Sequence, residues 1–295
     1  MGQPTEGATC PLCKGTRSEK RFADNGYDVR QCAVCDLFFI DPFPVSADAQ
    51  HERVREYTYD DLAVADADKH YRAEVVYYAE HAEAVRAEVR GASSILDVGC
   101  GTGRLLELLG ADAGLRRAGI ELNSGRAAWA RQHAGCEIHQ VPVEDFASTD
   151  RFDVITMMNV LSHIPSFEGL FSSVRRLLTP GGKFILKTGE LESNVRHGDV
   201  FDWGVPDHLH FMGMRTAEAA ARQYGFTVVR HDRAPLTREL FSKTRWRMPG
   251  RSRARDAVKA VVAHTPLALR MLAALYAWRH GCRVWTATVV LKVAS

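Results

Sequence analysis

The stretch ILDVGCGTGRLLELL, residues 95–109, decides the fold. Apolar residues lead into Asp97, glycines follow at every second position from Gly99 to Gly103, and an amphipathic run begins at Arg104. This order is typical of a strand, a tight loop and a helix, the unit with which open α/β proteins hold nucleotide-like ligands. We therefore expect a ligand to lie against the glycines, at the end of this strand.

Strand-like and helix-like segments alternate on both sides of this stretch, from about residue 92 onward. Such alternation predicts a parallel sheet with helical crossovers. The expected strands are residues 93–98, 116–122, 136–141, 152–158, 183–188, 226–230 and 283–293. The expected helices are residues 104–110, 124–135, 167–178 and 216–225. Helix starts are expected at the N-caps Ser124 and Thr216, and helix ends at the glycines 135, 181 and 225.

The glycine loop does not fit the common phosphate-binding patterns. A dinucleotide fingerprint needs a small residue where Arg104 or Leu106 stands, and a phosphate loop needs a Gly-Lys-Ser/Thr that this stretch lacks. An acid directly before three glycines suits a ligand with positive charge. Glycines let the backbone approach closely, and Asp97 can accept hydrogen bonds from an ammonium group.

Further acids follow the next two expected strands. Glu121 ends the second strand, where a carboxylate can accept hydrogen bonds from both hydroxyls of a ribose. After the third strand, the run Val143-Glu144-Asp145-Phe146 places an acid for an exocyclic amine beside apolar side chains. Ammonium, ribose and adenine in this order predict S-adenosylmethionine as the ligand.

At these residues the sequence resembles the class I S-adenosylmethionine-dependent methyltransferases, over roughly residues 92–190. The matching stretches are ILDVGCGTG, GIELN, VPVEDF, FDVITMMNVLSHI and LLTPGGKFILKTG, with PDHLHFMGMRTAEAAARQYGF further on. The resemblance implies a Rossmann-like α/β fold whose seven-stranded sheet is parallel except for an antiparallel last strand. It also implies the contacts of the cofactor: the methionine half with Asp97, Gly99, Gly101 and Gly103, the ribose with Glu121, the adenine with Val143 and Asp145 or Glu144, and the sulfonium side with Asn159.

Two CxxC pairs, Cys10/Cys13 and Cys32/Cys35, precede the sheet. Four thiolates on two turns fit tetrahedral zinc, and a site closed by four protein ligands serves folding. Unmetallated or iron-bound thiols are the alternatives. The segment also resembles the zinc-ribbon lead of a subset of these methyltransferases, many of which act on sugars or secondary metabolites. We expect a zinc ribbon over residues 1–45, a helical linker or lid over 46–90, and a methyltransferase domain over 91–295.

Histidines supply the candidate general bases. Methyl transfer is an in-line displacement, and a hydroxyl acceptor benefits from a base near neutral pH. His163 follows the fourth strand and His208 follows the fifth, and we expect them to be catalytic, although a structural role stays open for both. A metal site made of Asp207, His208 and His210 is an alternative.

Aromatic residues carry two further expectations. Four of them would either line an acceptor pocket or pack in the core: Phe201, Trp203, Phe211 and Tyr224. Tyr57 and Tyr59 would form a lid over the cofactor.

Residues 232–282 interrupt the alternation with a basic run followed by an apolar helical stretch. The basic run would suit an anionic acceptor or RNA, or form a solvated loop. The helix would shape a pocket, pair with another subunit, lie on a membrane surface, or pack on the core.

Composition and net charge bear on the location of the protein and on its class of function. The net charge of the 295 residues is only +2, which gives no global argument for binding nucleic acid or membranes. We expect a cytoplasmic protein, because no signal core or transmembrane run is visible. The predicted activity is methyl transfer to a hydroxyl or carbon of a small sugar or natural product. An RNA base methyltransferase and a catalytically inactive binding protein are the alternatives, and a homodimer is left open.

Overall fold

The computed structural model describes residues 5–6, 8–43, 78, 81–111, 114–199, 203–236, 265–280 and 283–294. The expectations for Tyr57, Tyr59 and Phe201, for most of the linker and for the basic run between residues 237 and 264 lie outside the described residues.

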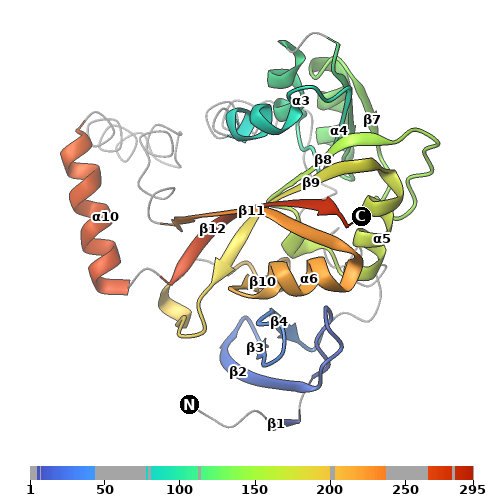
Figure 1. The fold of residues 1–295 in the computed structure, drawn as a ribbon. Coiled ribbons are helices and arrows are strands. Elements are labelled where there is room, and N and C mark those ends of the chain that lie inside the picture. The colour runs from blue at the N-terminus through green and yellow to red at the C-terminus, as the bar shows by residue number, and fades with distance from the viewer. Residues whose placement is uncertain are drawn as a thin grey trace.

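A central sheet runs through the molecule and contains seven strands in the order β7-β6-β5-β8-β9-β12-β11 (Figure 1). Strands β5 to β9 pair in parallel, and β12 is antiparallel to both β9 and β11. The expected seven-stranded mixed sheet is therefore confirmed. The strand bounds are β5 Ser94–Val98, β6 Arg116–Ile120, β7 Glu137–His139, β8 Phe152–Met158, β9 Leu178–Leu191, β11 Phe226–Pro235 and β12 Val284–Val293.

Helices connect the strands of this sheet where the periodicity predicts them. Helix α5 shows the reason most clearly, because its buried residues recur every three or four positions and form one apolar face. None of the helices in the described ranges is long and apolar enough to cross a bilayer. The helical elements are residues 81–89, α3 Arg104–Leu108, η2 Leu109–Ala111, α4 Ser124–His133, η3 Leu161–His163, α5 Phe167–Leu177, η4 His197–Asp199, α6 Thr216–Tyr224 and α10 Pro266–His280.

The expected start of α4 and the expected end of α5 are wrong. The N-cap of α4 is Asn123, whose side chain accepts a hydrogen bond from the Arg126 amide at 2.8 Å, so Ser124 is already the first helical residue. Helix α5 ends where β9 begins, and Gly181 lies within β9 in the left-handed conformation. By contrast, Gly225 ends α6 in the left-handed conformation, as the sequence predicts.

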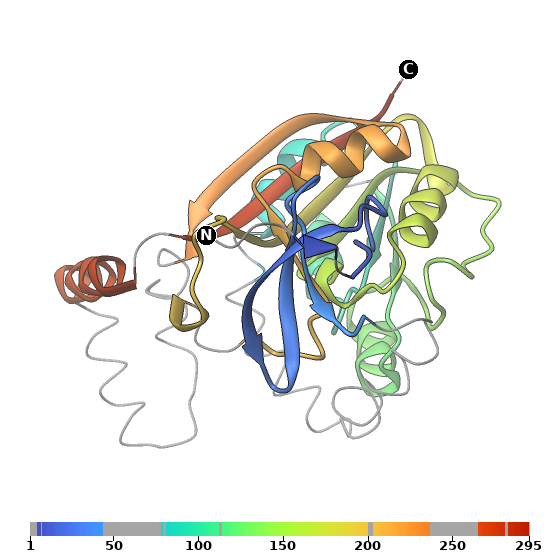
Figure 2. The ribbon, with the colours of Figure 1, turned by 90° about the horizontal axis from the view of Figure 1, so that it is seen from below.

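The N-terminal ribbon consists of β1 Thr5–Glu6, β2 Arg17–Asp24, β3 Tyr27–Cys32 and β4 Phe38–Asp41. Strand β10 His210–Gly213, which was not predicted from the sequence, joins β4 of the ribbon to the central sheet. Strand β10 is antiparallel to β4 and parallel to the end of β9. The four ribbon strands, β10 and the seven strands therefore form one twelve-stranded sheet, with the ribbon next to β10 and α6 (Figures 1 and 2).

Side chains and backbone fasten the ribbon to the start of α6. Arg215 donates to both carboxylate oxygens of Asp36, at 3.0 and 3.1 Å. The hydroxyl of Thr216 accepts from the Gly213 amide and donates to the Cys35 carbonyl, at 2.9 and 3.0 Å. Thr216 is thus not the expected N-cap of α6, because its hydroxyl is engaged in this junction.

The backbone contact at Gly213 makes the junction sensitive to a single methyl group. A Cβ on Gly213 would lie 2.2 Å from the carbonyl oxygen of Asp36. We expect Gly213→Ala to lower the free energy of unfolding by about 1–3 kcal/mol, as overpacking does elsewhere. The matched control is Gly189→Ala in β9, where a Cβ would meet nothing within 4 Å. Equal thermal unfolding of the two variants would contradict a tightly docked ribbon.

Candidate functional site

The glycine loop after β5 adopts a conformation that only glycine takes without strain. Gly99, Gly101 and Gly103 have φ angles of 73°, 57° and 78°. A Cβ on Gly99 would lie 2.4 Å from a methyl group of Val160, and one on Gly103 would lie 2.7 Å from the Cβ of Ala134. The loop therefore passes close to the chain after β8 and to the end of α4.

Glu121 holds this loop from the adjacent strand. It follows β6, is 6% exposed, and accepts hydrogen bonds from the amides of Gly101 and Asn123, both at 2.8 Å. Burial raises the pKa of the Glu121 carboxyl, and these amide bonds oppose that shift. One carboxyl group thus fixes the positions of both the glycine loop and Asn123, the residue that caps α4.

Asp97 is buried beside the loop, near the end of β5, with 1% of its surface exposed. The Thr156 hydroxyl in β8 donates to Asp97 Oδ1 at 2.7 Å. Burial raises the pKa of Asp97 to about 7, the bond from Thr156 lowers it, and the nearby charge of Glu121 raises it further. Because a cation would favour the ionised form, this carboxyl is suited to an ammonium group. Sequence reasoning missed Thr156, although a polar residue within the apolar run FDVITMM was the available signal.

The expected adenine contacts lie together in one turn after β7. Val143 is buried, Glu144 is half-buried and Asp145 is exposed. Phe146 is buried beside the ring of His139, with the two ring centres 4.7 Å apart. The turn thus offers apolar surface and two acids near the ends of β6 and β7.

Asn159 follows β8 directly and has a left-handed φ of 58°. Its backbone N–H donates to the Lys187 carbonyl of β9 at 2.8 Å. Since β5, β6 and β8 are parallel neighbours, Asp97, Glu121 and Asn159 lie at the same carboxyl edge of the sheet. Open α/β sheets bind their ligands at this edge.

His163 and His208 come together near this edge, with their ring centres 4.7 Å apart. The Nδ1–H of His163 donates to the Asp207 carbonyl at 3.0 Å, and the Asp207 carboxylate lies 3.3 Å from the same nitrogen. The Nδ1–H of His208 donates to the Trp203 carbonyl at 2.8 Å. Because a carbonyl only accepts, each neutral ring has its lone pair on Nε2, the atom that would take a proton.

His210 does not join this cluster, so the structure does not bring together the alternative metal set of Asp207, His208 and His210. It begins β10, is 1% exposed, and its Nε2–H donates to the Ile164 carbonyl at 3.0 Å. Burial lowers the pKa of His210 to about 3. The group that does converge is His163, Asp207 and His208, whose potential ligand atoms lie within 4.8 Å of one another.

The aromatic residues expected near an acceptor lie mainly in packed clusters. Trp203 is 2% exposed, donates from its indole nitrogen to the His197 carbonyl, and meets the ring of Phe211 edge-on. Tyr224 stacks on the buried ring of Phe171 at 4.8 Å. These contacts favour the core alternative for Trp203 and Tyr224.

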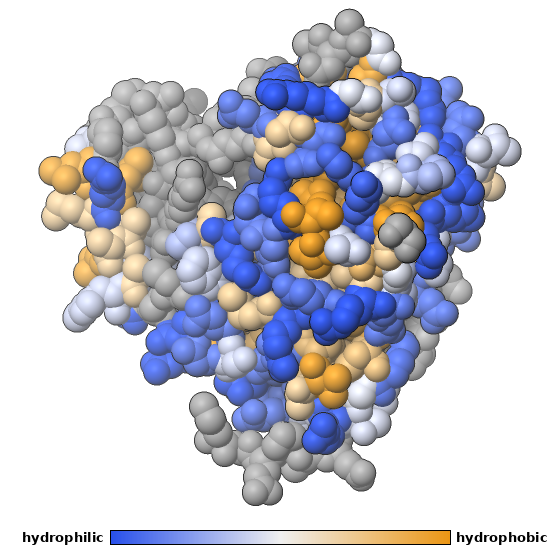
Figure 3. Space-filling view, in the orientation of Figure 1, coloured by the Kyte–Doolittle hydropathy of each residue, from blue (hydrophilic) through white to orange (hydrophobic). Residues whose placement is uncertain are grey.

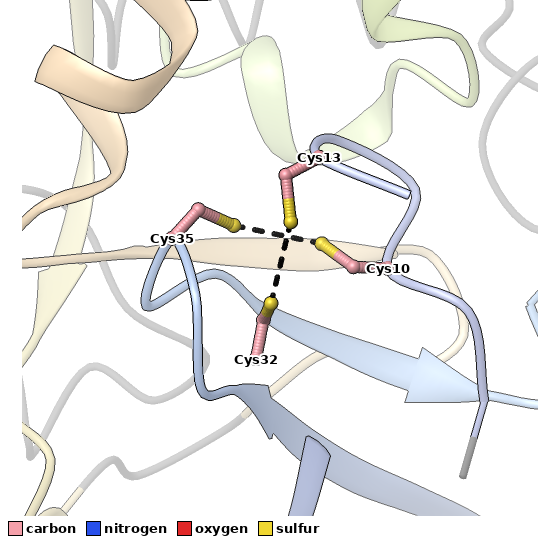
Figure 4. A group of neighbouring side chains, drawn as sticks. All are labelled: Cys10, Cys13, Cys32 and Cys35. Carbon is pink, nitrogen blue, oxygen red and sulfur yellow. Dashed lines mark hydrogen bonds between the residues drawn. The ribbon is translucent and has the colours of Figure 1, made fainter. Parts of the chain in front are cut away.

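The four paired cysteines converge on one point (Figure 4). The Sγ atoms of Cys10 and Cys35 are 3.5 Å apart, as are those of Cys13 and Cys32, which is far beyond a disulfide bond. The Val34 amide donates to the Cys32 sulfur at 3.4 Å. Hydrogen bonds from Cys10 and Cys35 lower the pKa of Cys32, which favours its thiolate form.

Comparisons with known proteins identify a methyltransferase domain in the central part of the chain. A family model described as "Methyltransferase domain" matches residues 68–231. A ubiquinone biosynthesis O-methyltransferase of Haemophilus ducreyi is 38% identical over 105 residues, which cover 32% of this chain and 44% of that protein. The same-named protein of Nitrosococcus oceani is 42% identical over 101 residues, covering 32% and 42%. The chain thus spans less than half the length of the curated relatives it matches.

Solved structures share the fold at low identity. A cyclopropane synthase from Mycobacterium tuberculosis matches with a TM-score of 0.51 and 16% identity, covering 68% of this chain and 78% of that one. A geranyl diphosphate C-methyltransferase from Streptomyces coelicolor, in complex with S-adenosyl-L-homocysteine, matches with a TM-score of 0.50 and 16% identity, covering 68% and 69%.

The raised pKa of Asp97 makes a prediction about stability. A folded-state pKa of about 7 exceeds the ordinary 3.8, so the folded protein binds the extra proton and loses stability as pH rises from about 4 to 7. Asp97→Asn removes this cost and keeps an acceptor for Thr156. Its thermal midpoint should therefore rise relative to the parent protein, and rise more at pH 8 than at pH 5. The exposed Asp145→Asn serves as the control, and a pH-independent effect of Asp97→Asn would contradict the assignment.

Proposed function

The chain belongs to the methyltransferase-domain family, and we propose on that basis that it transfers a methyl group from S-adenosylmethionine to a small-molecule acceptor. The observation that carries the proposal is the pair of buried carboxyl groups beside the glycine loop. Asp97 supplies a negative charge for the ammonium of the methionine half, close to a backbone that has no Cβ atoms in the way. Glu121 lies at the next strand end, where it would bind the ribose hydroxyls.

The remaining cofactor contacts follow from the same sheet edge. The turn after β7 would hold the adenine between the apolar surface of Val143 and a carboxylate of Asp145 or Glu144. Asn159 would lie near the sulfonium. Much of the rate in such a reaction comes from aligning the acceptor behind the methyl group, because the donor is already activated.

Oxygen is the acceptor atom that the relatives support. The curated relatives are named O-methyltransferases, and a hydroxyl is also the acceptor that needs a base. His163 and His208 would serve as that base through Nε2, since their Nδ1–H groups are held by backbone carbonyls. The Asp207 carboxylate beside His163 would stabilise the imidazolium after proton transfer. A cytoplasmic location and a small metabolite as the acceptor complete the proposal.

Structural zinc is the second part of the proposed function. Four ligands at about 2.3 Å in a tetrahedron place sulfur atoms about 3.8 Å apart, close to the separations of the two cysteine pairs. A site closed by four thiolates has no open position for chemistry. Zinc would instead stabilise the ribbon turn at Cys35, whose carbonyl accepts the hydrogen bond from Thr216.

Calorimetric titration with S-adenosylmethionine and S-adenosylhomocysteine tests cofactor binding. We expect both to bind, and Glu121→Gln to weaken both by about tenfold or more. Gln has one acceptor oxygen where Glu121 uses two, so one of the amides of Gly101 and Asn123 would face an NH₂ group. Glu137→Gln, at an exposed position of β7, should leave affinity unchanged. If neither ligand binds the parent protein, the methyltransferase proposal fails in favour of an inactive binding protein.

Elemental analysis of the purified chain tests the metal. We expect about one zinc per chain, the ratio of a closed four-thiolate site. Cys13→Ser should lose the metal and lower the thermal midpoint, while Cys136→Ser, outside the cluster, should keep both. Iron in place of zinc, or a full zinc content in Cys13→Ser, would contradict the assignment.

A further inference from the structure

Helix α10 is attached to the body of the protein along one side. Leu269 is 7% exposed, and the Tyr276 hydroxyl donates to the Asp199 carbonyl at 3.1 Å. Just beyond the helix, Arg283 donates to both carboxylate oxygens of Asp199, at 3.1 and 3.2 Å. In both ribbon views α10 lies at the edge of the molecule (Figures 1 and 2). The attachment orients the helix and turns its opposite side outward.

The outward side carries a continuous apolar surface, which we name the α10 stripe. Its residues are Leu267, Met271, Leu275 and Trp278, which are 68%, 64%, 58% and 83% exposed. At 3.6 residues per turn, these positions fall within an arc of about 80°. Apolar side chains gather over α10 in the space-filling view (Figure 3). In the described ranges, only Val34 and Val229 are other large apolar side chains with comparable exposure, and they lie on separate elements.

Positive charge borders the α10 stripe on both sides. Arg270 and Arg279 are exposed and lie roughly 90° to either side of the stripe's centre. The helix contains no Asp or Glu, and residues 237–280 contain ten Lys or Arg against two Asp or Glu. Since the whole chain has a net charge of only +2, the rest of the sequence is net acidic. The positive charge of the sequence is therefore concentrated in the stretch that contains α10.

An anionic lipid surface matches this combination better than a second copy of the chain. A two-fold contact would bring the same cationic helix against itself, with no acid on α10 to pair with the arginines. At a bilayer, arginine side chains extend to the headgroups while apolar side chains enter the acyl boundary. Tryptophan also favours that interface. We propose that α10 docks in the plane of an anionic bilayer through the α10 stripe.

The position of α10 connects this docking to the candidate site. Strand β12 starts just after α10, and its Val284 pairs with Leu191 at the carboxyl end of β9. The helix is therefore attached at the edge of the sheet that carries Asp97 and Glu121. Docking does not depend on the proposed function, but if that function holds, the acceptor edge lies toward the bilayer and a lipid-soluble acceptor can enter directly.

Vesicle co-sedimentation of the full chain tests the proposal. We expect binding to vesicles of phosphatidylcholine with about one third phosphatidylglycerol, weak binding to phosphatidylcholine alone, and release by salt. The double variant Met271→Glu/Trp278→Glu should reduce binding to the anionic vesicles by about tenfold or more, because it places two carboxylates in the interface. Val229→Glu, on β11 at 52% exposure, is the matched control and should bind as the parent does.

Three results would overturn the proposal. The first is no binding of the parent to the anionic vesicles, and the second is equal binding by the double variant. The third is a parent protein that binds no vesicles but forms a concentration-dependent dimer in light scattering, with the dimer lost in the double variant. A second copy of the chain would then cover the α10 stripe.

Calorimetry with S-adenosylhomocysteine on the same variants distinguishes the docking proposal from the proposed function. Unchanged cofactor affinity with lost vesicle binding confirms docking alone, and vesicle binding without cofactor affinity leaves docking intact while the proposed function fails.

Discussion

The two hydrogen bonds that the Glu121 carboxyl accepts from Gly101 and Asn123 are the constraint on which the site depends. They connect the end of one strand to the loop after its neighbour and to the cap of the following helix. The loop can lie there only because its glycines have no Cβ to collide with Val160 or Ala134. A buried acid would otherwise be costly, so the amide donors make its position tolerable while leaving further lone pairs for a ligand.

Asp97 differs from Glu121 in how it is satisfied. Its one hydroxyl donor, Thr156, does not compensate for burial, and its pKa rises toward neutrality. A carboxyl of this kind is a poor contributor to the stability of the empty protein and a good partner for a cation. Binding sites commonly combine such a group with a rigid frame, since the ligand then supplies the charge that the fold lacks.

The sequence predicted the central sheet well because strand-like and helix-like segments alternate regularly and several of them end at glycines. It also led to the paired cysteines, which the structure brings together, and to Asp97 and Glu121, which the structure places at one edge of the sheet. It did not predict β10, because this strand pairs with Phe38 and Phe39, about 170 residues earlier in the chain. The predicted starts of α4 and α6 were wrong for a related reason. Asn123 caps α4 and Thr216 bonds to the ribbon, and these roles depend on the neighbouring loop and ribbon. Helix propensity, which depends on local sequence, carries no information about those neighbours.

Strand β10 has partners on both sides only while the ribbon is present. A shortened chain that began after the ribbon would leave one side of β10 unpaired and would uncover buried residues such as Leu209 and Met212. Unpaired strand edges next to apolar surface are templates for association with other chains. The ribbon thus covers this strand edge, and an N-terminal truncation made to isolate the central sheet would expose it to association with other chains.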